Sequence, residues 1–177
     1  MSPRSEKQKM IAGELYHAQD SELIAARATA AKALQAYNGG GDPALLLHLL
    51  ASNGPGSELR APFFCDYGFN IHIGARVFLN FNCVLLDVTP IHIGDDTKIG
   101  PGVHIYAADH PRDPAIRRQH LECGRPITIG RNIWIGGGAI LLPGITIGDD
   151  AIIGAGSVVT RDVVAGTTVV GNPAKAR

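Results

Sequence analysis

The sequence predicts a mainly β fold, a parallel β-helix, preceded by a small helical region at the N-terminus. Aliphatic residues recur every six positions over the last two-thirds of the chain, and a glycine directly follows seven of these twelve positions. A period of six fits neither an α-helix nor an alternating strand. It is typical of a solenoid whose short strands each point one side chain inward before the chain turns a corner. The inward positions are Ile73, Leu79, Leu85, Ile93, Ile99, Ile105, Ile129, Ile135, Leu141, Ile147, Ile153 and Val159.

Length and composition narrow the classes of function. The 177 residues suffice for one domain with a substantial core, and 16 basic residues balance 16 acidic ones. Nucleic-acid surfaces need a basic stripe and stacking rings, but the net charge is zero and aromatic residues make up 6%. The sequence contains no apolar run long enough to span a membrane, and no secretory signal at its start. We therefore expect a cytoplasmic protein that binds neither nucleic acid nor membrane.

Residues 1–58 predict an N-terminal helical cap. Their apolar residues fall at helix-compatible spacings, and their alanine-rich centre favours helix on intrinsic grounds. Asp20 or Ser21 is suited to begin the second helix as its N-cap. Asp42 and Pro43 are suited to begin a third, short helix.

Residues 59–170 carry the six-residue repeat and predict the solenoid, with residues 171–177 as a C-terminal tail. Three repeats make one triangular coil, so the region holds about five or six coils. Each inward aliphatic residue then stacks on its equivalent one coil away, at the ordinary interstrand spacing of about 4.8 Å.

The repeat is interrupted twice. Between Leu85 and Ile93 the spacing is eight, which predicts two extra residues bulging from a corner near Thr89. The segment 106–126 keeps the phase of the repeat but has no inward pattern and is rich in charged residues. A long loop inserted in a regular solenoid is usually functional, so we expect an arm projecting from one corner.

Four passages resemble the hexapeptide-repeat acyltransferases, and within them most closely the maltose O-acetyltransferases of the maltose/galactoside O-acetyltransferase group. They are MIAGELY (10–16), FFCDYGFNIHIG (63–74), LNFNCVLLDVTPIHIGDDTKIGPGVHIYAADHPRDP (79–114) and PITIGRNIWIGGGAILLPGITIGDDAIIGAGSVVTRDV (126–163). The resemblance implies a left-handed β-helix and transfer of acetyl from acetyl-CoA to a sugar hydroxyl. It also implies a homotrimer with active sites between subunits, and no metal requirement.

His110, in the arm, is the candidate catalytic residue. Acetyl transfer to an alcohol needs a base that removes the hydroxyl proton, and the ordinary pKa of imidazole lies near the operating pH. His110 matches the histidine with this role in the family. Without the resemblance, a solvated loop histidine is the simpler interpretation. The seven histidines and three cysteines have no recognisable metal-ligand spacing, so we expect no metal site.

The resemblance also supplies candidate binding residues. Asn80, Asp87, Asp66 and Tyr67 match positions that line the acceptor pocket. The coenzyme A positions are Gly137, Ala155, Thr160, Arg161 and Lys175. In the run 136–138 three glycines let the main chain approach a thioester closely, and the Gly137 N–H is suited to stabilise an oxyanion.

Two alternative functions stay open at this point. The chain could acetylate a different hydroxyl or amine, on an antibiotic, an amino sugar or serine, which a panel of acceptors would decide. It could also be a non-catalytic β-helix scaffold, in which case coenzyme A would not bind.

Overall fold

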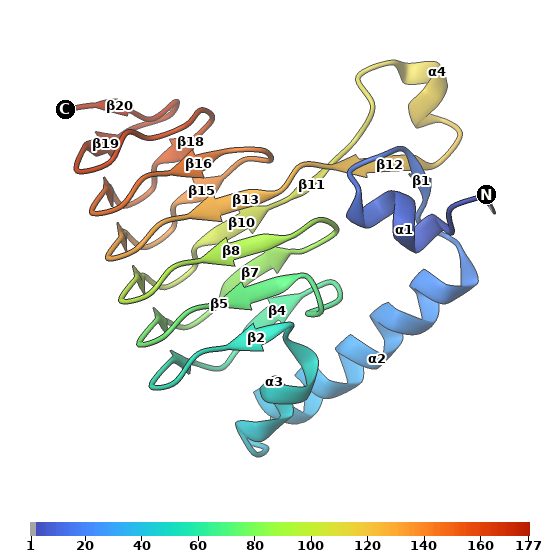
Figure 1. Ribbon diagram of the computed structural model, residues 1–177, viewed down its shortest axis with the longest axis horizontal. Helices are drawn as coiled ribbons and strands as arrows, with labels where there is room; N and C mark the ends of the chain where they lie inside the picture. The colour runs from blue at the N-terminus through green and yellow to red at the C-terminus, as the bar shows by residue number, and fades with distance from the viewer. Residues whose placement is uncertain (1–2) are drawn as a thin grey trace.

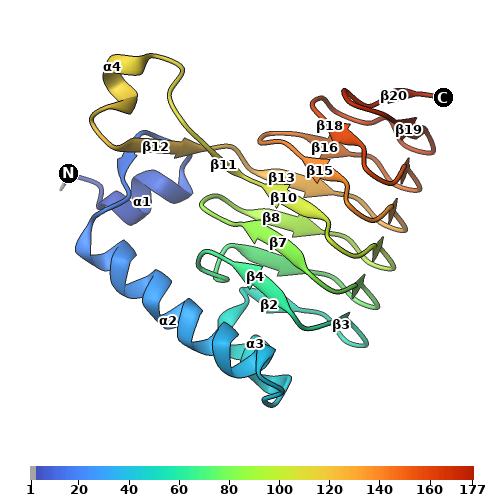
Figure 2. The same ribbon diagram turned by 180° about the vertical axis from the view of Figure 1, so that it is seen from behind.

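Residues 3–177 are described by a computed structural model, and they form a β-solenoid of about six stacked parallel coils. Helices run along one side of the solenoid, and an arm projects beside them (Figures 1 and 2). The mainly β, parallel coiled fold predicted from the six-residue period is confirmed.

The solenoid has three walls, each a sheet whose strands come from successive coils. Wall 1 contains β2 (Ser52–Asn53), β5 (Ile71–Ile73), β8 (Ile91–Ile93), β13 (Ile127–Ile129) and β16 (Thr146–Ile147). Wall 2 contains β3 (Glu58–Leu59), β6 (Phe78–Leu79), β9 (Lys98–Ile99), β14 (Trp134–Ile135), β17 (Ile152–Ile153), β19 (Thr168–Val170) and β20 (Lys175–Ala176). Wall 3 contains β4 (Phe63–Cys65), β7 (Cys83–Leu86), β10 (His104–Tyr106), β15 (Ile140–Leu141) and β18 (Val158–Val159). The C-terminal tail folds back here, because β20 pairs antiparallel with β19.

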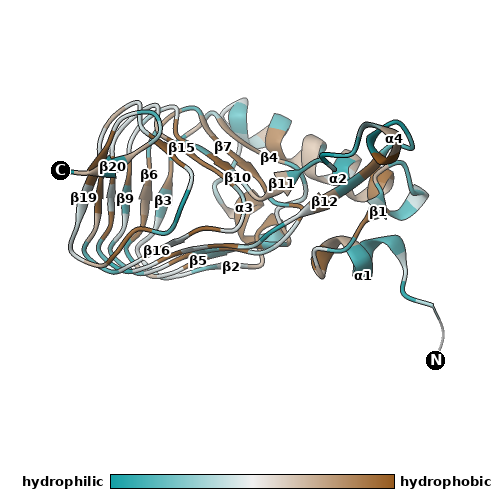
Figure 3. Cartoon of the chain, turned by 90° about the horizontal axis from the view of Figure 1, so that it is seen from above, coloured by the Kyte–Doolittle hydropathy of each residue, from teal (hydrophilic) through white to brown (hydrophobic). Residues whose placement is uncertain are grey.

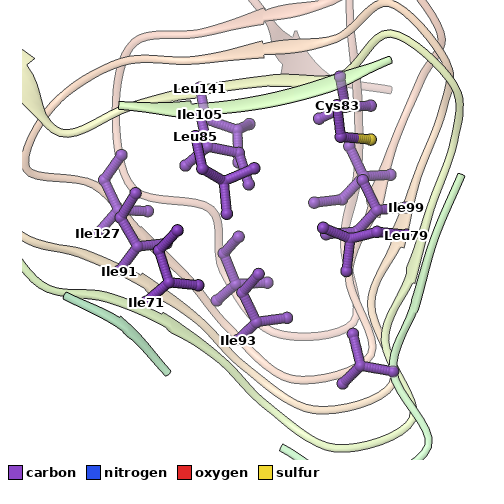
Figure 4. Close-up of a cluster of buried hydrophobic side chains, with 14 of the residues drawn as sticks. Ile71, Leu79, Cys83, Leu85, Ile91, Ile93, Ile99, Ile105, Ile127 and Leu141 are labelled. Atoms are coloured by element: carbon purple, nitrogen blue, oxygen red, sulfur yellow. The ribbon is translucent and has the colours of Figure 1, made fainter. Parts of the chain in front are cut away.

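Aliphatic columns fill the interior of the coils. Parallel pairing places Leu85 opposite Ile105, and Ile105 opposite Leu141, so equivalent side chains stack from coil to coil (Figure 4). All twelve inward positions predicted from the sequence are at most 2% exposed. The structure adds a second inward column that the period of six did not reveal, since Ile71 and Ile91 are also fully buried two residues earlier on wall 1.

Truncating one residue of a column should destabilise the whole solenoid. Leu85 is fully buried, so Leu85→Ala should lower the free energy of unfolding by about 2–5 kcal/mol through lost burial and a residual cavity. Leu47→Ala is the matched control, because Leu47 is 58% exposed. Chemical denaturation of both variants measures the difference, and equal losses would contradict the assignment of Leu85 to the core.

The predicted cap contains three helices, α1 (Glu6–Ile11), α2 (Ser21–Asn38) and α3 (Ala44–Leu49). Asp20 is the N-cap of α2, and its carboxylate accepts a hydrogen bond from the Glu22 N–H at 3.0 Å. Apolar residues of α2 and α3 join the core beside the first coil. The first solenoid strand, β2, begins at Ser52, before the predicted boundary at 59. No helix within residues 3–177 has the length and apolar character needed to cross a membrane.

The arm has regular structure of its own, which its polar sequence did not indicate. It contains β11 (Ala108–Asp109), α4 (Pro114–Arg117) and β12 (Leu121–Gly124), and β12 also pairs with β1 (Tyr16–His17) of the N-terminal segment. A second small core, with Met10, Tyr16, Leu23, Tyr67 and Val88, lies beneath this contact. The extra residues predicted to bulge near Thr89 are therefore buried, because the N-terminal segment and the arm cover that corner.

Candidate active site

A groove of about 730 Å³ runs along the outer face of wall 2. The residue before each inward aliphatic points outward on this wall, and successive strands bring these side chains into one ladder. The ladder residues that line the groove are Phe78, Lys98, Trp134, Ile152 and Thr168. Three predicted site residues, Asn80, Gly137 and Ala155, lie at the same groove, on the corner where wall 2 ends. A volume of this size is ordinary for a small-molecule or cofactor site.

The corner offers two backbone N–H groups to a ligand. Within residues 3–177, the N–H groups of Gly137 and Ala155 donate to no backbone carbonyl, although the flanking Gly136 and Gly138 N–H groups do. A Cβ atom on Gly137 would lie 3.0 Å from the Pro101 carbonyl oxygen, so a side chain there would crowd the neighbouring coil. The glycine therefore lets the coils approach and keeps its N–H open to the groove.

Asn80 lies at the groove on wall 2, whereas the predicted phosphate-binding cations lie elsewhere. Asn80 lines the groove, and its Oδ1 accepts a hydrogen bond from the Phe81 N–H at 2.8 Å, which fixes the amide plane. Arg161 lines a separate pocket near the C-terminal end, and Lys175 is exposed on β20. Thr160 is exposed after β18.

Sequence reasoning missed the two cations and the indole that line the groove. Lys98 and Arg177 supply its positive charge, and Trp134, 60% exposed, supplies a flat aromatic surface. The sequence signal was present, because Lys98 and Trp134 each precede an inward isoleucine on wall 2. The sequence alone does not show which outward residues share a face, because that depends on how the strands pair.

His110 lies in the arm, held by a network around Asp109. The Asp109 carboxylate accepts from the His110 N–H at 2.8 Å and from the Arg112 guanidinium at 2.9 and 3.1 Å. Arg112 also donates to the His110 carbonyl oxygen at 3.0 Å. Asp109 thus holds the backbone of His110 directly at its N–H and through Arg112 at its carbonyl, whereas the exposed residue His110 lines a pocket of about 190 Å³.

A second pocket of about 210 Å³ adjoins the pocket of His110 and shares Glu122 with it. Asp66 and Tyr67 line this pocket, so the structure brings these two predicted acceptor residues near the arm. Burial raises the pKa of Asp66, an effect that the nearby Arg27 guanidinium opposes. Arg27 donates to the Tyr67 hydroxyl at 2.6 Å and fixes that ring. Arg27 and Glu122 were not singled out from the sequence, which does not reveal that helix α2 and the arm meet.

Asp87 does not line either pocket. It is fully buried, and its carboxylate accepts from the backbone N–H groups of Asp66, Tyr67 and Asn70 at 3.1, 2.9 and 3.3 Å. The expected direct contact of Asp87 with an acceptor is therefore corrected to a contact with the segment that carries Asp66 and Tyr67.

The remaining histidines form no metal centre. His72 and His92 stack on the outer face of wall 1 with ring centroids 4.4 Å apart, and burial lowers the pKa of His72. Among residues 3–177, no three histidines, cysteines or carboxylates are grouped so as to hold a metal ion.

The groove and the His110 pocket lie on opposite sides of the solenoid. The arm leaves the solenoid after β10 on wall 3 and returns in β13 on wall 1, so it projects from the corner opposite wall 2 (Figure 3). No described pocket contains both His110 and Asn80. A single chain thus keeps the groove and the arm pocket apart.

Comparison with known proteins identifies the family. Residues 9–52 match the maltose acetyltransferase hexapeptide capping motif, residues 70–107 match the hexapeptide repeat of succinyl-transferase, and residues 126–161 match the bacterial transferase hexapeptide family. Nodulation protein L of Rhizobium meliloti strain 1021 is 56% identical, over 98% of this chain and 98% of its own length.

Solved structures agree with this assignment. A maltose O-acetyltransferase from Clostridium difficile 630 superposes with a TM-score of 0.96 at 42% identity, covering 99% of this chain and 97% of that chain. A galactoside acetyltransferase in complex with coenzyme A superposes with a TM-score of 0.93 at 31% identity, covering 99% of this chain and 90% of that chain. The chain therefore belongs to the hexapeptide-repeat acetyltransferases, in the group of the maltose and galactoside O-acetyltransferases.

Proposed function

We propose that this protein transfers the acetyl group of acetyl-CoA to a hydroxyl of a sugar of the maltose, glucose or galactoside type, with His110 as general base. The groove on wall 2 binds the donor, and the pockets beside the arm bind the acceptor. Coenzyme A bound to a galactoside acetyltransferase of the same fold supports the choice of donor.

Direct transfer needs no acyl-enzyme. The acceptor hydroxyl gives its proton to the His110 imidazole while its oxygen attacks the thioester carbonyl carbon. The new C–O bond moves the carbonyl electrons onto oxygen, and the Gly137 N–H stabilises that negative charge. When the carbonyl re-forms, the C–S bond breaks, and the departing thiolate takes the proton from the imidazolium.

We place this reaction between neighbouring chains of a homotrimer. The observation that carries this proposal is the separation of two half-sites, the groove and the arm pocket, on opposite sides of one chain. An arm from one chain and a groove from the next complete one site, so three identical contacts close a ring. Arg161 and Lys175 lie outside the groove of their own chain, and we assign them to the coenzyme A phosphates at the same shared site.

The test is acetyl-CoA consumption with a panel of acceptors. Maltose, glucose and galactosides should be acetylated faster than serine, amino sugars at nitrogen, or antibiotics. A marked preference for an amine would contradict the proposed sugar hydroxyl. Thermal protection by coenzyme A separates an enzyme from a scaffold, since a scaffold without a donor site would show no such shift.

Replacing Asp109 should impair turnover without altering donor affinity. Asp109→Ala removes the carboxylate that holds the backbone of His110, so kcat should fall by about tenfold to a hundredfold as the imidazole loses its position. The KM for acetyl-CoA should stay unchanged, because the groove lies on another wall. Asp113→Ala, which removes the N-cap of α4 in the same arm, is the control. Steady-state kinetics would contradict the assignment if both variants lost turnover equally.

A further inference from the structure

We infer that Asp87 is a positioning residue for the acceptor half of the site: its buried carboxylate holds the backbone of residues 66–70 and so fixes where Asp66 and Tyr67 enter their pocket. The inference rests on the proposed function, because it assigns that pocket to the acceptor. It replaces direct contact between Asp87 and the sugar with an action through the backbone.

The hydrogen bonds between Asp87 and this segment run in both directions. Oδ1 accepts from the Asp66 and Tyr67 N–H groups, and Oδ2 accepts from the Asn70 N–H. The Asn70 side-chain amide in turn donates to the Asp87 and Val88 carbonyl oxygens at 2.7 and 3.2 Å. Three backbone N–H groups of the segment converge on one carboxylate and define the conformation of residues 66–70, which lie between β4 and β5 and belong to neither strand.

The burial of this carboxylate is costly, which indicates a specific purpose. No ion pair involves Asp87 within residues 3–177, and its side chain is fully buried. An apolar side chain would avoid the burial of charge but would leave the buried N–H groups of Tyr67 and Asn70, and the partly buried N–H of Asp66, without a hydrogen-bond acceptor. The segment therefore requires a hydrogen-bond acceptor at position 87.

The charged groups around Asp87 come from several elements. Asp66 lies on the segment itself and the Cys65 thiol at the end of β4, whereas Arg27 of α2 and Glu122 of β12 act on Asp66. Burial, the largest effect, raises the pKa of Asp87 to about 7, and the backbone hydrogen bonds from Tyr67 and Asn70 only partly oppose it.

The raised pKa of Asp87 determines how opening of the segment should depend on pH. Opening of the segment would expose Asp87 to water and return its pKa towards the ordinary carboxyl value near 4, so the closed form binds the proton more tightly. Between about pH 4 and 7, opening releases a proton and becomes easier as the pH rises. Protection of the amides of residues 66–70 should therefore decrease towards pH 8 and level off there.

Amide hydrogen exchange of the full chain, without ligands, tests how the segment is held. Asp87→Ala should speed exchange in residues 66–70 by about tenfold, and Asp87→Asn should largely restore protection, because an amide oxygen still accepts from Asp66 and Tyr67. Asp87→Asn should also abolish the pH dependence seen in the wild type after correction for intrinsic rates. Asp95→Ala is the matched control, since its carboxylate accepts from the Ala75 N–H at another corner.

Kinetics with acetyl-CoA and the best sugar of the panel test the link to the acceptor. The acceptor KM of Asp87→Ala should rise about tenfold, with the acetyl-CoA KM unchanged and with rescue in Asp87→Asn. Unchanged exchange in residues 66–70 of Asp87→Ala would overturn the positioning role. Equal increases in the acceptor KM and the acetyl-CoA KM would contradict a role of Asp87 confined to the acceptor half of the site. If no sugar of the panel were acetylated, both the proposed function and the role of Asp87 in sugar binding would be refuted. The hydrogen-exchange result would still decide whether Asp87 holds the segment.

Discussion

Replacement of His110 by alanine should lower kcat by about two to four orders of magnitude, the usual contribution of a positioned general base. Two imidazoles, of His110 and His120, line the arm pocket, and imidazole is suited to take a hydroxyl proton near neutral pH. We assign the base to His110, because His110 is the one that matches the catalytic histidine of the family. Neither KM should change greatly, because the donor groove and the Asp66 pocket remain intact. Release of coenzyme A thiol, followed with a thiol reagent, measures the loss.

Two comparisons make this result specific. His48→Ala removes an exposed histidine from α3 and should leave turnover unchanged. His110→Asn keeps a polar side chain of similar size but cannot act as a base, so it should be as impaired as alanine. Undiminished turnover in either His110 variant would remove the proposed mechanism.

Mixed trimers should regain activity that neither parent variant has. His110→Ala disables the arm of a chain, and Ala155→Trp fills its groove, so each homotrimer alone should be nearly inactive. In a random equimolar mixture, half of the arms and half of the grooves are intact. If each site pairs the arm of one chain with the groove of another, about one site in four is wild type.

Co-expression with two different affinity tags isolates the mixed species, and light scattering confirms its size before assay. Each isolated mixed trimer has one wild-type site among its three, so recovery of about a third of wild-type turnover supports sites shared between chains. If each chain contained its own complete site, every site in the mixture would carry one defect, and the mixture would remain as inactive as its parents.

The core could be predicted from the sequence, whereas the arrangement of the half-sites could not. A buried position in a solenoid depends on the local repeat, so Ile99 and Leu141 were recognisable from spacing alone. The second inward column escaped notice because small and polar residues such as Ala139 and Thr97 interrupt it. Thr97 satisfies its hydroxyl there by donating to the Gly130 carbonyl oxygen at 3.0 Å.

The candidate site divides in the same manner. The resemblance assigned Gly137 and Ala155 to one ligand, and both line one groove, because corner positions follow the repeat. It could not separate Asp87 from Asp66, since only the packing of the 66–70 segment shows which carboxylate is buried and which faces a pocket. The sequence could not indicate Glu122, because its place at the pockets depends on the pairing of β12 with β1.

The pairing of β12 with β1 has an evolutionary consequence. The pockets assigned to the acceptor are built mainly from the N-terminal segment and the arm, whereas the groove assigned to the donor is built from the repeats. Mutations around His110 in the first part can alter which substrate is chosen while leaving His110 and the donor groove intact. New acceptor specificities can therefore arise on the same solenoid by exchange of the N-terminal segment and the arm. Grafting both together from one relative to another should transfer the acceptor preference.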